Sequence, residues 1–457
     1  MRQPVCLCLL SLTLLLLAPA APAAAQSVPA GPAYFPPLTG TEWATVAPAS
    51  LGWCPDRLAA LLDYAGSRRT DALLIVHDGR LVVEKYYGTY TAESTHYWAS
   101  AGKSLVATLV GLAQQDKMLS LDEPTARLLG AGWTTAPPAK EALITIRHQL
   151  SMTTGLDDNL PATPQVPDPD NCLAPPCLAY RADAGTRWAY HNAPYRLLQN
   201  VVAQASGLTF NQYTRQRLTT SLGMSGVWLD YTYYSRARDM ARFGLFIAAR
   251  GSWAGTPILT DAAYFRAMTT SSQTLNPSYG YLWWLNGQPN YRLPGPQQVT
   301  FPGPLIPAAP ADLLAALGRD DQKIYVVPSL RLVVVRQGAS AGASISQAAS
   351  SFDNELWTRI MALYCSATAT ARPGAVDARY AAFPNPVAAG ALLTLRQPAG
   401  AATKLRLLDA QGRAVRQQAV SGAESHLGTA GLAAGLYAAQ WLDAAGRVLA
   451  TRRVVRE

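Results

Sequence analysis

Ala72-Leu-Leu-Ile-Val-His-Asp78-Gly79-Arg-Leu-Val-Val-Glu-Lys-Tyr-Tyr87 is the stretch that decides the architecture of most of this 457-residue chain. Two runs rich in β-branched and aromatic residues flank Asp78-Gly79, a pair that favours a tight two-residue turn. The stretch predicts an antiparallel hairpin with strands over 72–77 and 80–87. Just before it, apolar residues at helical spacing predict a short amphipathic helix over 55–66.

After this hairpin the sequence signals change from strand to helix and later return to strand. From Ser100 to about Met118, apolar residues recur at i, i+3 and i+4, which predicts a helix that begins at Ser100. The other predicted elements are helices over 195–206 and 237–250, strands over 323–327 and 332–336, and a closing helix over 352–364. Strands at both ends with helices between them predict an α+β fold, in which an antiparallel sheet is flanked by helices and a helical region.

Composition divides the chain into four parts. Residues 1–25 combine a positive start, a short apolar run and small residues at a cleavage site, the pattern of a secretory signal peptide. Residues 26–365 hold the α+β domain, and residues 366–379 form a linker rich in Ala, Thr, Pro and Gly. Residues 380–457 carry only strand and turn signals, so they predict a small all-β sandwich.

Removal of the signal peptide leaves four cysteines, Cys54, Cys172, Cys177 and Cys365. An even number in an exported chain favours disulfides over metal or redox sites. Cys172 and Cys177 flank the turn-forming Leu-Ala-Pro-Pro, so we expect a local disulfide there, and Cys54 would then pair with Cys365. Four free, buried thiols are the alternative. No cysteine has a His-rich neighbourhood, so a zinc site is not expected.

The net charge of +9 is spread along the chain rather than gathered in one basic run. Nine Lys and Arg against four acids follow Tyr380, which gives the tail +5 and leaves about +3 for the larger domain once Arg2 is removed. The charges of the tail alternate with apolar residues, as on the faces of strands. We interpret them as solvated surface and expect no nucleic-acid partner.

Ser100-Ala-Gly-Lys103 places a hydroxyl and an amine on one face of the predicted helix, because residues three apart are neighbours there. A serine hydroxyl becomes a nucleophile when a neighbouring base takes its proton. Backbone N–H groups at a helix N-terminus also favour developing negative charge. The pattern predicts Ser100 as nucleophile with Lys103 as its base; a helix-capping serine and a solvated lysine are the alternative.

Tyr190-His-Asn192 offers further groups for acyl transfer. A phenol near a cation can relay a proton to a leaving group. The Asn192 amide offers a donor and an acceptor to a substrate or to Lys103. Taken alone, the pair is better explained by a tyrosine that packs on the following helix. Together with Ser100 and Lys103 it predicts a serine hydrolase.

With these motifs in this order, the chain resembles the class C β-lactamase-related serine hydrolases, which include β-lactamases, D-Ala-D-Ala peptidases, carboxylesterases and 6-aminohexanoate-dimer hydrolases. The similar segments are Trp98-Ala-Ser-Ala-Gly-Lys-Ser-Leu, His148-Gln-Leu-Ser-Met-Thr-Thr-Gly-Leu, Gly185-Thr-Arg-Trp-Ala-Tyr-His-Asn, Arg238-Asp-Met-Ala-Arg-Phe-Gly, Tyr279-Gly-Tyr-Leu-Trp-Trp and Gln322-Lys-Ile-Tyr-Val-Val-Pro. The resemblance spans about residues 71–364 and implies a β-lactamase/transpeptidase-like fold. It also implies catalytic roles for Ser100, Lys103 and Tyr190.

The chain departs from β-lactamases of this family on one strand. Where those carry Lys-Thr-Gly, this sequence has Ala316-Leu317-Gly318, followed by Arg319. The resemblance implies that Gly318 allows close approach of substrate, and that the backbone N–H groups of Ser100 and Arg319 form an oxyanion hole. The missing lysine would bind a penicillin or peptide carboxylate, and whether Arg319 replaces it is open. We therefore expect a carboxylesterase or amidase; β-lactamase or D-Ala-D-Ala peptidase activity, or a catalytically silent cell-wall binding module, are the alternatives.

The tail resembles the C-terminal sorting domains of type IX secretion. The similar segments are Phe383-Pro-Asn-Pro, Leu405-Arg-Leu-Leu-Asp-Ala-Gln-Gly-Arg, Leu432-Ala-Ala-Gly-Leu-Tyr and Arg452-Arg-Val-Val-Arg. The resemblance implies export through the periplasm of a Bacteroidetes-like bacterium, with the secretion machinery as partner; a carbohydrate-binding or adhesive sandwich is the alternative. We expect a secreted or cell-surface monomer that cleaves a small-molecule ester, an amide or a short peptide without metal or organic cofactor.

Other residues suggest roles without deciding them. Asp157-Asp158 lie in a turn and could bind a substrate amine, and Trp283-Trp284 could line a pocket or pack in the core. His77 and His148 are better explained as structural histidines than as bases. The loop between Tyr291 and Asp312, rich in Pro and Gly, is expected to set the size of the pocket.

Overall fold

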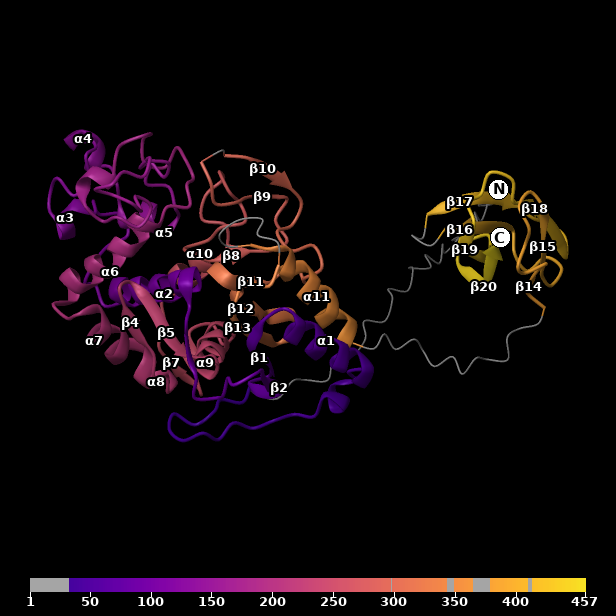
Figure 1. The fold of residues 1–457 in the computed structure, drawn as a ribbon, viewed down its shortest axis with the longest axis horizontal. Coiled ribbons are helices and arrows are strands. Elements are labelled where there is room, and N and C mark those ends of the chain that lie inside the picture. Colours follow the sequence, from indigo (N-terminus) through magenta and orange to yellow (C-terminus); the bar gives the residue numbers. More distant parts are fainter. Residues whose placement is uncertain (1–32, 297, 343–348, 365–378, 410–412) are drawn as a thin grey trace, which may run out of the picture. The chain divides into compact units, whose positions relative to one another are not determined.

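The computed structural model describes residues 33–296, 298–342, 349–364, 379–409 and 413–457. The chain divides into two compact units, one up to residue 365 and one from residue 366 on (Figure 1). The expected signal peptide, Cys365 and the expected linker up to residue 378 lie outside the described residues. Among the described helices, none has the length and apolar character needed to cross a membrane.

A six-stranded antiparallel sheet, in the order β2-β1-β13-β12-β11-β8, forms the centre of the first unit. Its strands are β1 (Thr70–His77), β2 (Arg80–Tyr86), β8 (Trp284–Leu285), β11 (Leu314–Gly318), β12 (Gln322–Val327) and β13 (Leu332–Gly338). The expected hairpin is confirmed, since Asp78 and Gly79 join β1 to β2 with φ angles of 51° and 80°. β1 also pairs with β13, so strands from both ends of this unit meet inside one sheet.

Helices cover both faces of this sheet. Those that pack on it or beside it are α1 (Pro55–Ser67), α9 (Ala237–Ala248) and α11 (Ser351–Leu363). Gly244 of α9 lies against Ile324 of β12. The next residue, Tyr325, packs edge-on against Trp357 of α11, with ring centroids 5.6 Å apart. Successive side chains of a strand point to opposite faces, so α9 and α11 lie on opposite sides of the sheet.

The helical region lies on the side of the sheet away from α1 and α11 (Figure 1). Its elements are α2 (Gly102–Gln115), α3 (Ala126–Leu129), α4 (Pro138–Glu141), α5 (Ile146–Leu150), α6 (Asn192–Ser206), α7 (Phe210–Thr214), α8 (Thr220–Leu222) and α10 (Ala262–Thr269). A small antiparallel sheet of β3 (Thr95–Tyr97), β5 (Thr232–Arg236) and β4 (Val227–Leu229) lies beside the 3-10 turn η2 (Ala99–Ala101) that leads into α2. The two-stranded pairs are β6 (Ser252–Trp253) with β7 (Thr256–Pro257), and β9 (Asn290–Arg292) with β10 (Thr300–Pro302).

A buried ionic cluster ties the end of β11 to the far side of the sheet. Lys323 of β12 is buried, with Nζ 3.1 Å from an Asp321 oxygen and 2.9 Å from an Asp353 oxygen. Asp321 belongs to the short 3-10 segment η5 (Arg319–Asp321), which follows β11 directly. Removal of one partner of this buried cluster would leave an uncompensated charge, so the cluster ties η5 to β12 and α11.

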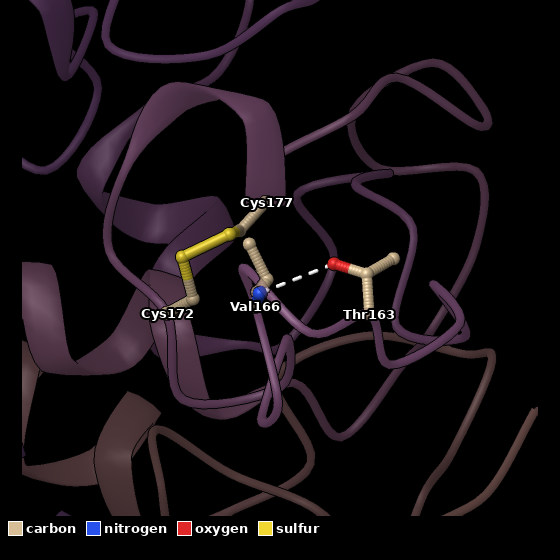
Figure 2. The surroundings of a disulfide bond; sticks show 4 residues. All are labelled: Thr163, Val166, Cys172 and Cys177. Atoms are coloured by element: carbon tan, nitrogen blue, oxygen red, sulfur yellow. Dashed lines mark hydrogen bonds between the residues drawn. A yellow bond between two sulfur atoms is a disulfide. The ribbon is translucent and has the colours of Figure 1, made fainter.

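The disulfide expected between Cys172 and Cys177 is confirmed, with the two Cα atoms 5.8 Å apart (Figure 2). It closes a loop of the helical region between α5 and α6. Cys54 is also disulfide-bonded. Its expected partner, Cys365, lies outside the described residues.

The second unit consists of two antiparallel sheets that enclose one apolar core. One sheet contains β14 (Ala381–Phe383), β15 (Leu392–Arg396) and β18 (Glu424–Gly428); the other contains β17 (Ala414–Ala419), β16 (Lys404–Leu408), β19 (Gly435–Leu442) and β20 (Val448–Arg456). Leu393 and Leu395 of the first sheet pack in the same core as Leu405, Leu407 and Trp441 of the second. Alternating inward-facing residues on both sheets form a small all-β sandwich.

Candidate active site

Ser100 lies in the η2 turn, two residues before the helix begins, and not within the helix as its periodicity predicted. The turn is anchored by Trp98, whose backbone N–H donates to the Tyr233 carbonyl and whose indole donates to Ser235 Oγ, both at 2.8 Å. Ala99, just before the serine, has a φ of 47°, in the left-handed region that costs energy for a residue with a side chain. The surrounding structure therefore holds the turn that carries Ser100 in a defined conformation, with the strained backbone at Ala99.

Lys103 points from the first turn of α2 to the serine. Its side chain is almost wholly buried, with 1% of the residue exposed. Nζ lies 2.8 Å from Ser100 Oγ and 2.7 Å from Asn192 Oδ1. The rings of Tyr190 and Tyr195 form walls of the amine site, at 4.5 and 3.9 Å from Nζ to their centroids. The structure thus brings Ser100, Lys103, Tyr190 and Asn192 together.

Burial lowers the pKa of Lys103 well below its usual value of 10.5. The Asp170 carboxylate opposes this effect, while the charges of Arg196 and Arg319 add to it. Only the uncharged amine of a lysine can accept a proton, and a lowered pKa extends the uncharged form to lower pH. The environment of Lys103 is therefore that of a base.

The Tyr190 hydroxyl is buried close to Ser100. Its ring stacks on Trp284, with centroids 5.7 Å apart. Burial raises the pKa of Tyr190, and a contact with the Ser100 hydroxyl lowers it by less. Among the described residues, no other group makes a well-formed hydrogen bond to this hydroxyl. The phenol therefore keeps its proton in the resting protein and is free to donate it to a group bound beside Ser100.

Both polar ends of the Asn192 amide are occupied by side chains. Its Oδ1 accepts from Lys103, as described above, and its Nδ2 donates to Asp170 Oδ2 at 2.6 Å. The backbone N–H of Asn192 donates to Asp170 Oδ1 at 3.0 Å. Asp170 was not predicted from the sequence, and no local pattern marks it, since it stands in an irregular loop 22 residues before Asn192.

Gly318 ends β11 against the serine turn. A Cβ at this position would collide with the Trp98 carbonyl oxygen and would lie 3.1 Å from the Ala101 nitrogen. The resemblance implied a glycine that allows close approach of substrate, which stays a prediction; the collision shown here is with the chain itself. The absence of a side chain is needed so that β11 can pack on the turn that carries Ser100. This contact also brings Arg319, the next residue, beside the serine.

A cavity of about 340 Å³ opens beside Ser100. Its lining is mostly polar: Tyr97, Ala99, Ser100, Asn171, Asn192, Tyr195, Arg196, Thr232, Tyr234, Arg319 and Asp320. The expectation that the loop 291–312 sets the pocket was wrong, because no described residue of that loop lines this cavity. That loop instead carries most of the β9–β10 pair. Tyr195 and Arg196 were missed, although they lie three and four residues after Asn192 and so share its helix face.

The other candidate residues have structural partners. Asp158 is buried and its carboxylate lies 2.5 Å from the Arg187 guanidinium, and Asp157 pairs with Arg181 at 3.0 Å. His148 caps α5 through Thr145. None of these residues lines the cavity beside Ser100.

The two tryptophans belong to the core rather than to the cavity wall. Trp283 is fully buried and stacks with Phe243, with centroids 6.0 Å apart. Trp284 stacks on the ring of Tyr190. Neither lines the cavity beside Ser100. Trp284 therefore positions a site residue without contacting the space that a substrate would occupy.

Comparisons with known proteins support the fold of the first unit. A candidate 6-aminohexanoate-dimer hydrolase of Bacillus anthracis superposes with a TM-score of 0.53 at 17% identity, covering 71% of this chain and 86% of its own. A candidate β-lactamase of Bacteroides dorei gives 0.53 at 18% identity, over 68% of this chain and 99% of its own. A search of curated protein sequences found no match. The family model described as Beta-lactamase matches residues 56–336, which is more than half of the chain, so the protein belongs to the beta-lactamase family.

Proposed function

We propose that this protein hydrolyses an ester or an amide through an acyl-enzyme on Ser100, as a carboxylesterase or amidase. The observation that carries the proposal is the buried, pKa-lowered Lys103 amine 2.8 Å from Ser100 Oγ. A hydroxyl and an uncharged amine at this distance can exchange a proton directly. A module that only binds its partner has no need to bury a lysine in this way.

In the acylation half of the reaction, Lys103 Nζ takes the proton of Ser100 Oγ as the oxygen attacks the substrate carbonyl. The negative charge that develops on the carbonyl oxygen would be stabilised by the backbone N–H groups of Ser100 and Arg319. Tyr190 donates its phenolic proton to the leaving alcohol or amine and regains a proton from Lys103. The raised pKa of Tyr190 and the lowered pKa of Lys103 favour these roles, because the first keeps the proton on the phenol and the second favours the uncharged amine.

Deacylation uses the same groups in the reverse order. A water molecule takes the place of the leaving group, and Lys103 accepts its proton, directly or through the Tyr190 hydroxyl, as the water attacks the ester carbonyl of the acyl-enzyme. The bond between the acyl carbon and Ser100 Oγ then breaks, the serine regains a proton, and a carboxylic acid is released. Atoms and protons balance over the cycle without a metal ion or a redox group.

The substrate class follows from the end of β11. Ala316 stands where related β-lactamases carry a lysine, and it is buried, so its methyl group offers no charge to a substrate carboxylate. Arg319 lines the cavity and is the cation nearest in sequence to this position. A guanidinium at the mouth of a pocket does not reproduce an ammonium on the strand, because the two differ in reach and geometry. This favours esters and amides over β-lactams.

Purified protein should therefore hydrolyse p-nitrophenyl butyrate with a kcat/KM that exceeds the value for nitrocefin by about 10- to 100-fold, the loss expected for one charge-assisted hydrogen bond. The measurement is a pair of colorimetric assays on one preparation. A larger kcat/KM for nitrocefin would identify a β-lactamase instead. If no ester, amide or β-lactam is turned over and a fluorophosphonate leaves no adduct on Ser100, the protein is a binding module.

We further propose that the protein is exported and released at the cell surface, with residues 1–25 as signal peptide and residues 380–457 as a sorting domain. Two features support this. The composition of the first residues is that of a cleaved leader. The second unit has its own two-sheet core, and the candidate catalytic residues Ser100, Lys103 and Tyr190 all belong to the first unit.

Truncation after about Pro373 should leave ester hydrolysis and the melting temperature of the first unit nearly unchanged, because each unit has its own core. In a host with type IX secretion, the truncated protein should stay in the periplasm. A periplasmic reporter fused ahead of residues 366–457 is the matched control and should be released. Loss of activity on truncation, or release of the truncated protein, would contradict the assignment of the tail to sorting.

A further inference from the structure

Asp170 stands in a loop that the disulfide makes compact. The loop lies between α5 and α6, and the bridge from Cys172 to Cys177 begins just two residues after Asp170 (Figure 2). A turn just upstream is fastened by a hydrogen bond from the Val166 N–H to Thr163 Oγ1 at 3.1 Å (Figure 2). The next residue after Asp170, Asn171, lines the cavity beside Ser100. The loop therefore reaches the site although none of its residues belongs to a recognised motif.

The carboxylate of Asp170 contacts Asn192 at two points. Oδ1 accepts the backbone N–H at 3.0 Å, and Oδ2 accepts the side-chain Nδ2 at 2.6 Å. A primary amide has one donor end and one acceptor end. With Nδ2 turned to Asp170, Oδ1 must face the other way, where it lies 2.7 Å from Lys103 Nζ. Asp170, Asn192, Lys103 and Ser100 thus form one chain of polar contacts.

We propose that Asp170 is a positioning residue, which holds the Lys103 amine on Ser100 through Asn192 and is itself held by the Cys172–Cys177 loop. The inference rests on the proposed hydrolysis, because it assigns a role within that reaction. Loss of the Asp170 carboxylate is expected to lower kcat rather than to raise KM, since Asp170 does not line the cavity that would hold the substrate.

A simpler role for Asp170 must be separated from this one. Asn192 is the first residue of α6, and the N-cap residue His191 makes no side-chain capping bond. Asp170 could therefore serve only as a cap from outside the helix, which would stabilise the fold and leave catalysis alone. A cap needs the bond to the backbone N–H. It does not need the second bond to Nδ2, which is the bond that orients the amide.

The Asp170 carboxylate also acts on the pKa of Lys103, which it raises. Burial and the charges of Arg196 and Arg319 lower this pKa. The uncharged rings of Tyr190 and Tyr195 enclose the amine. Removal of the carboxylate leaves the two arginines unopposed. The pKa of Lys103 then falls further, and the pH at which the amine becomes active moves down.

The test is a double-mutant cycle on Asp170→Ala and Asn192→Ala with p-nitrophenyl butyrate as substrate. Asp170→Ala should lower kcat by about 10- to 100-fold with little change in KM, as loss of an orienting partner does. The rising limb of its kcat/KM against pH should move to lower pH. In the Asn192→Ala background, Asp170→Ala should lower kcat by less than about 3-fold, because the amide that Asp170 orients is already absent.

Three further variants sharpen the cycle. Asp168→Asn removes an exposed carboxylate from the same loop that contacts Asn171 rather than Asn192. Because Asn171 lines the cavity, this variant controls for kcat and for the pH profile, both of which should stay at the wild-type values. Asp170→Asn keeps the size of the side chain and serves if the alanine variant does not fold. It can still accept the backbone N–H but sets Nδ2 against Nδ2, so its kcat should fall while its melting temperature stays close to wild type. The pair Cys172→Ser and Cys177→Ser should lower kcat, with no added loss in the Asp170→Ala background.

The outcomes separate this inference from the proposed function. If wild-type protein neither turns over esters or amides nor gives a fluorophosphonate adduct on Ser100, the proposed function fails. If wild type is active and Asp170→Ala retains its kcat and pH profile, only the positioning role is overturned. Additive losses of kcat in the cycle would show that Asp170 does not act through Asn192. A loss of melting temperature without a loss of kcat would show that Asp170 is merely a helix cap.

Discussion

Replacement of Ser100 by alanine is expected to lower ester hydrolysis by on the order of 10⁴- to 10⁶-fold, the loss that removal of the nucleophile causes in serine hydrolases. The reason is that Lys103, Tyr190 and the cavity remain, but no atom is left on which the acyl group can be carried. Because Ser100 lies partly exposed in a turn, the melting temperature should change little. The measurement is kcat for p-nitrophenyl butyrate on a purified, folded variant.

The chain offers a matched control one turn further along. The buried Ser104 hydroxyl donates to the Leu282 carbonyl at 2.8 Å and contacts no described group of the site. Ser104→Ala should therefore keep its activity and lose about 1 kcal/mol of stability. Substantial turnover by Ser100→Ala, or equal losses in both variants, would remove the nucleophile role from Ser100.

Replacement of Lys103 by methionine is the second large effect. Methionine has a similar volume but no basic atom, so ester turnover should fall by about 10³-fold or more, the range found when a catalytic base is removed with its nucleophile left in place. Lys103→Arg is the informative companion, because a guanidinium keeps the hydrogen-bond donors but stays charged and does not release its proton near neutral pH. It should be as inactive as the methionine variant.

The wild-type enzyme should show the matching pH dependence. Activity requires the uncharged amine, so kcat/KM should rise with pH as Lys103 loses its proton, and the lowered pKa places this rise well below pH 10.5. If the rise occurs near pH 10.5, or if Lys103→Arg retains turnover, Lys103 is not the base.

Lys103→Met should also change how the stability of the first unit depends on pH. The folded pKa of Lys103 is lowered, so between that pKa and 10.5 the unfolded chain binds a proton that the folded chain does not. Wild-type stability therefore falls as the pH falls through this window, and Lys103→Met lacks this dependence. As the pH is lowered from 10 to 7, the melting temperature of Lys103→Met should rise relative to that of the wild type. Differential scanning fluorimetry measures this difference. A constant difference across this range would contradict the lowered pKa.

Helices and strands with a clear apolar pattern over several residues were predicted correctly from the sequence, and the shortest strands were not. The hairpin of β1 and β2, the strands β12 and β13 and the closing helix α11 each carry a repeating apolar pattern over several residues. β8 consists only of Trp284–Leu285, too short to show a period of two. The start of α2 was placed two residues early because Ser100 is held in a 3-10 turn by contacts of Trp98, and local periodicity does not record those contacts.

Within the candidate site, the sequence by itself determined the pair that lies within one helical turn. Ser100 and Lys103 are three residues apart, so the chain's own geometry brings hydroxyl and amine to 2.8 Å. The sequence also indicated Tyr190 and Asn192 as further residues of the site, through the order of its motifs and their resemblance to a known family. Only the tertiary structure decided the rest. Asp170 meets Asn192 across an irregular loop, and Arg196 and Arg319 approach Lys103 from separate elements. The state of the amine depends on burial and on charges far apart in the chain, and these arise only when distant segments pack together.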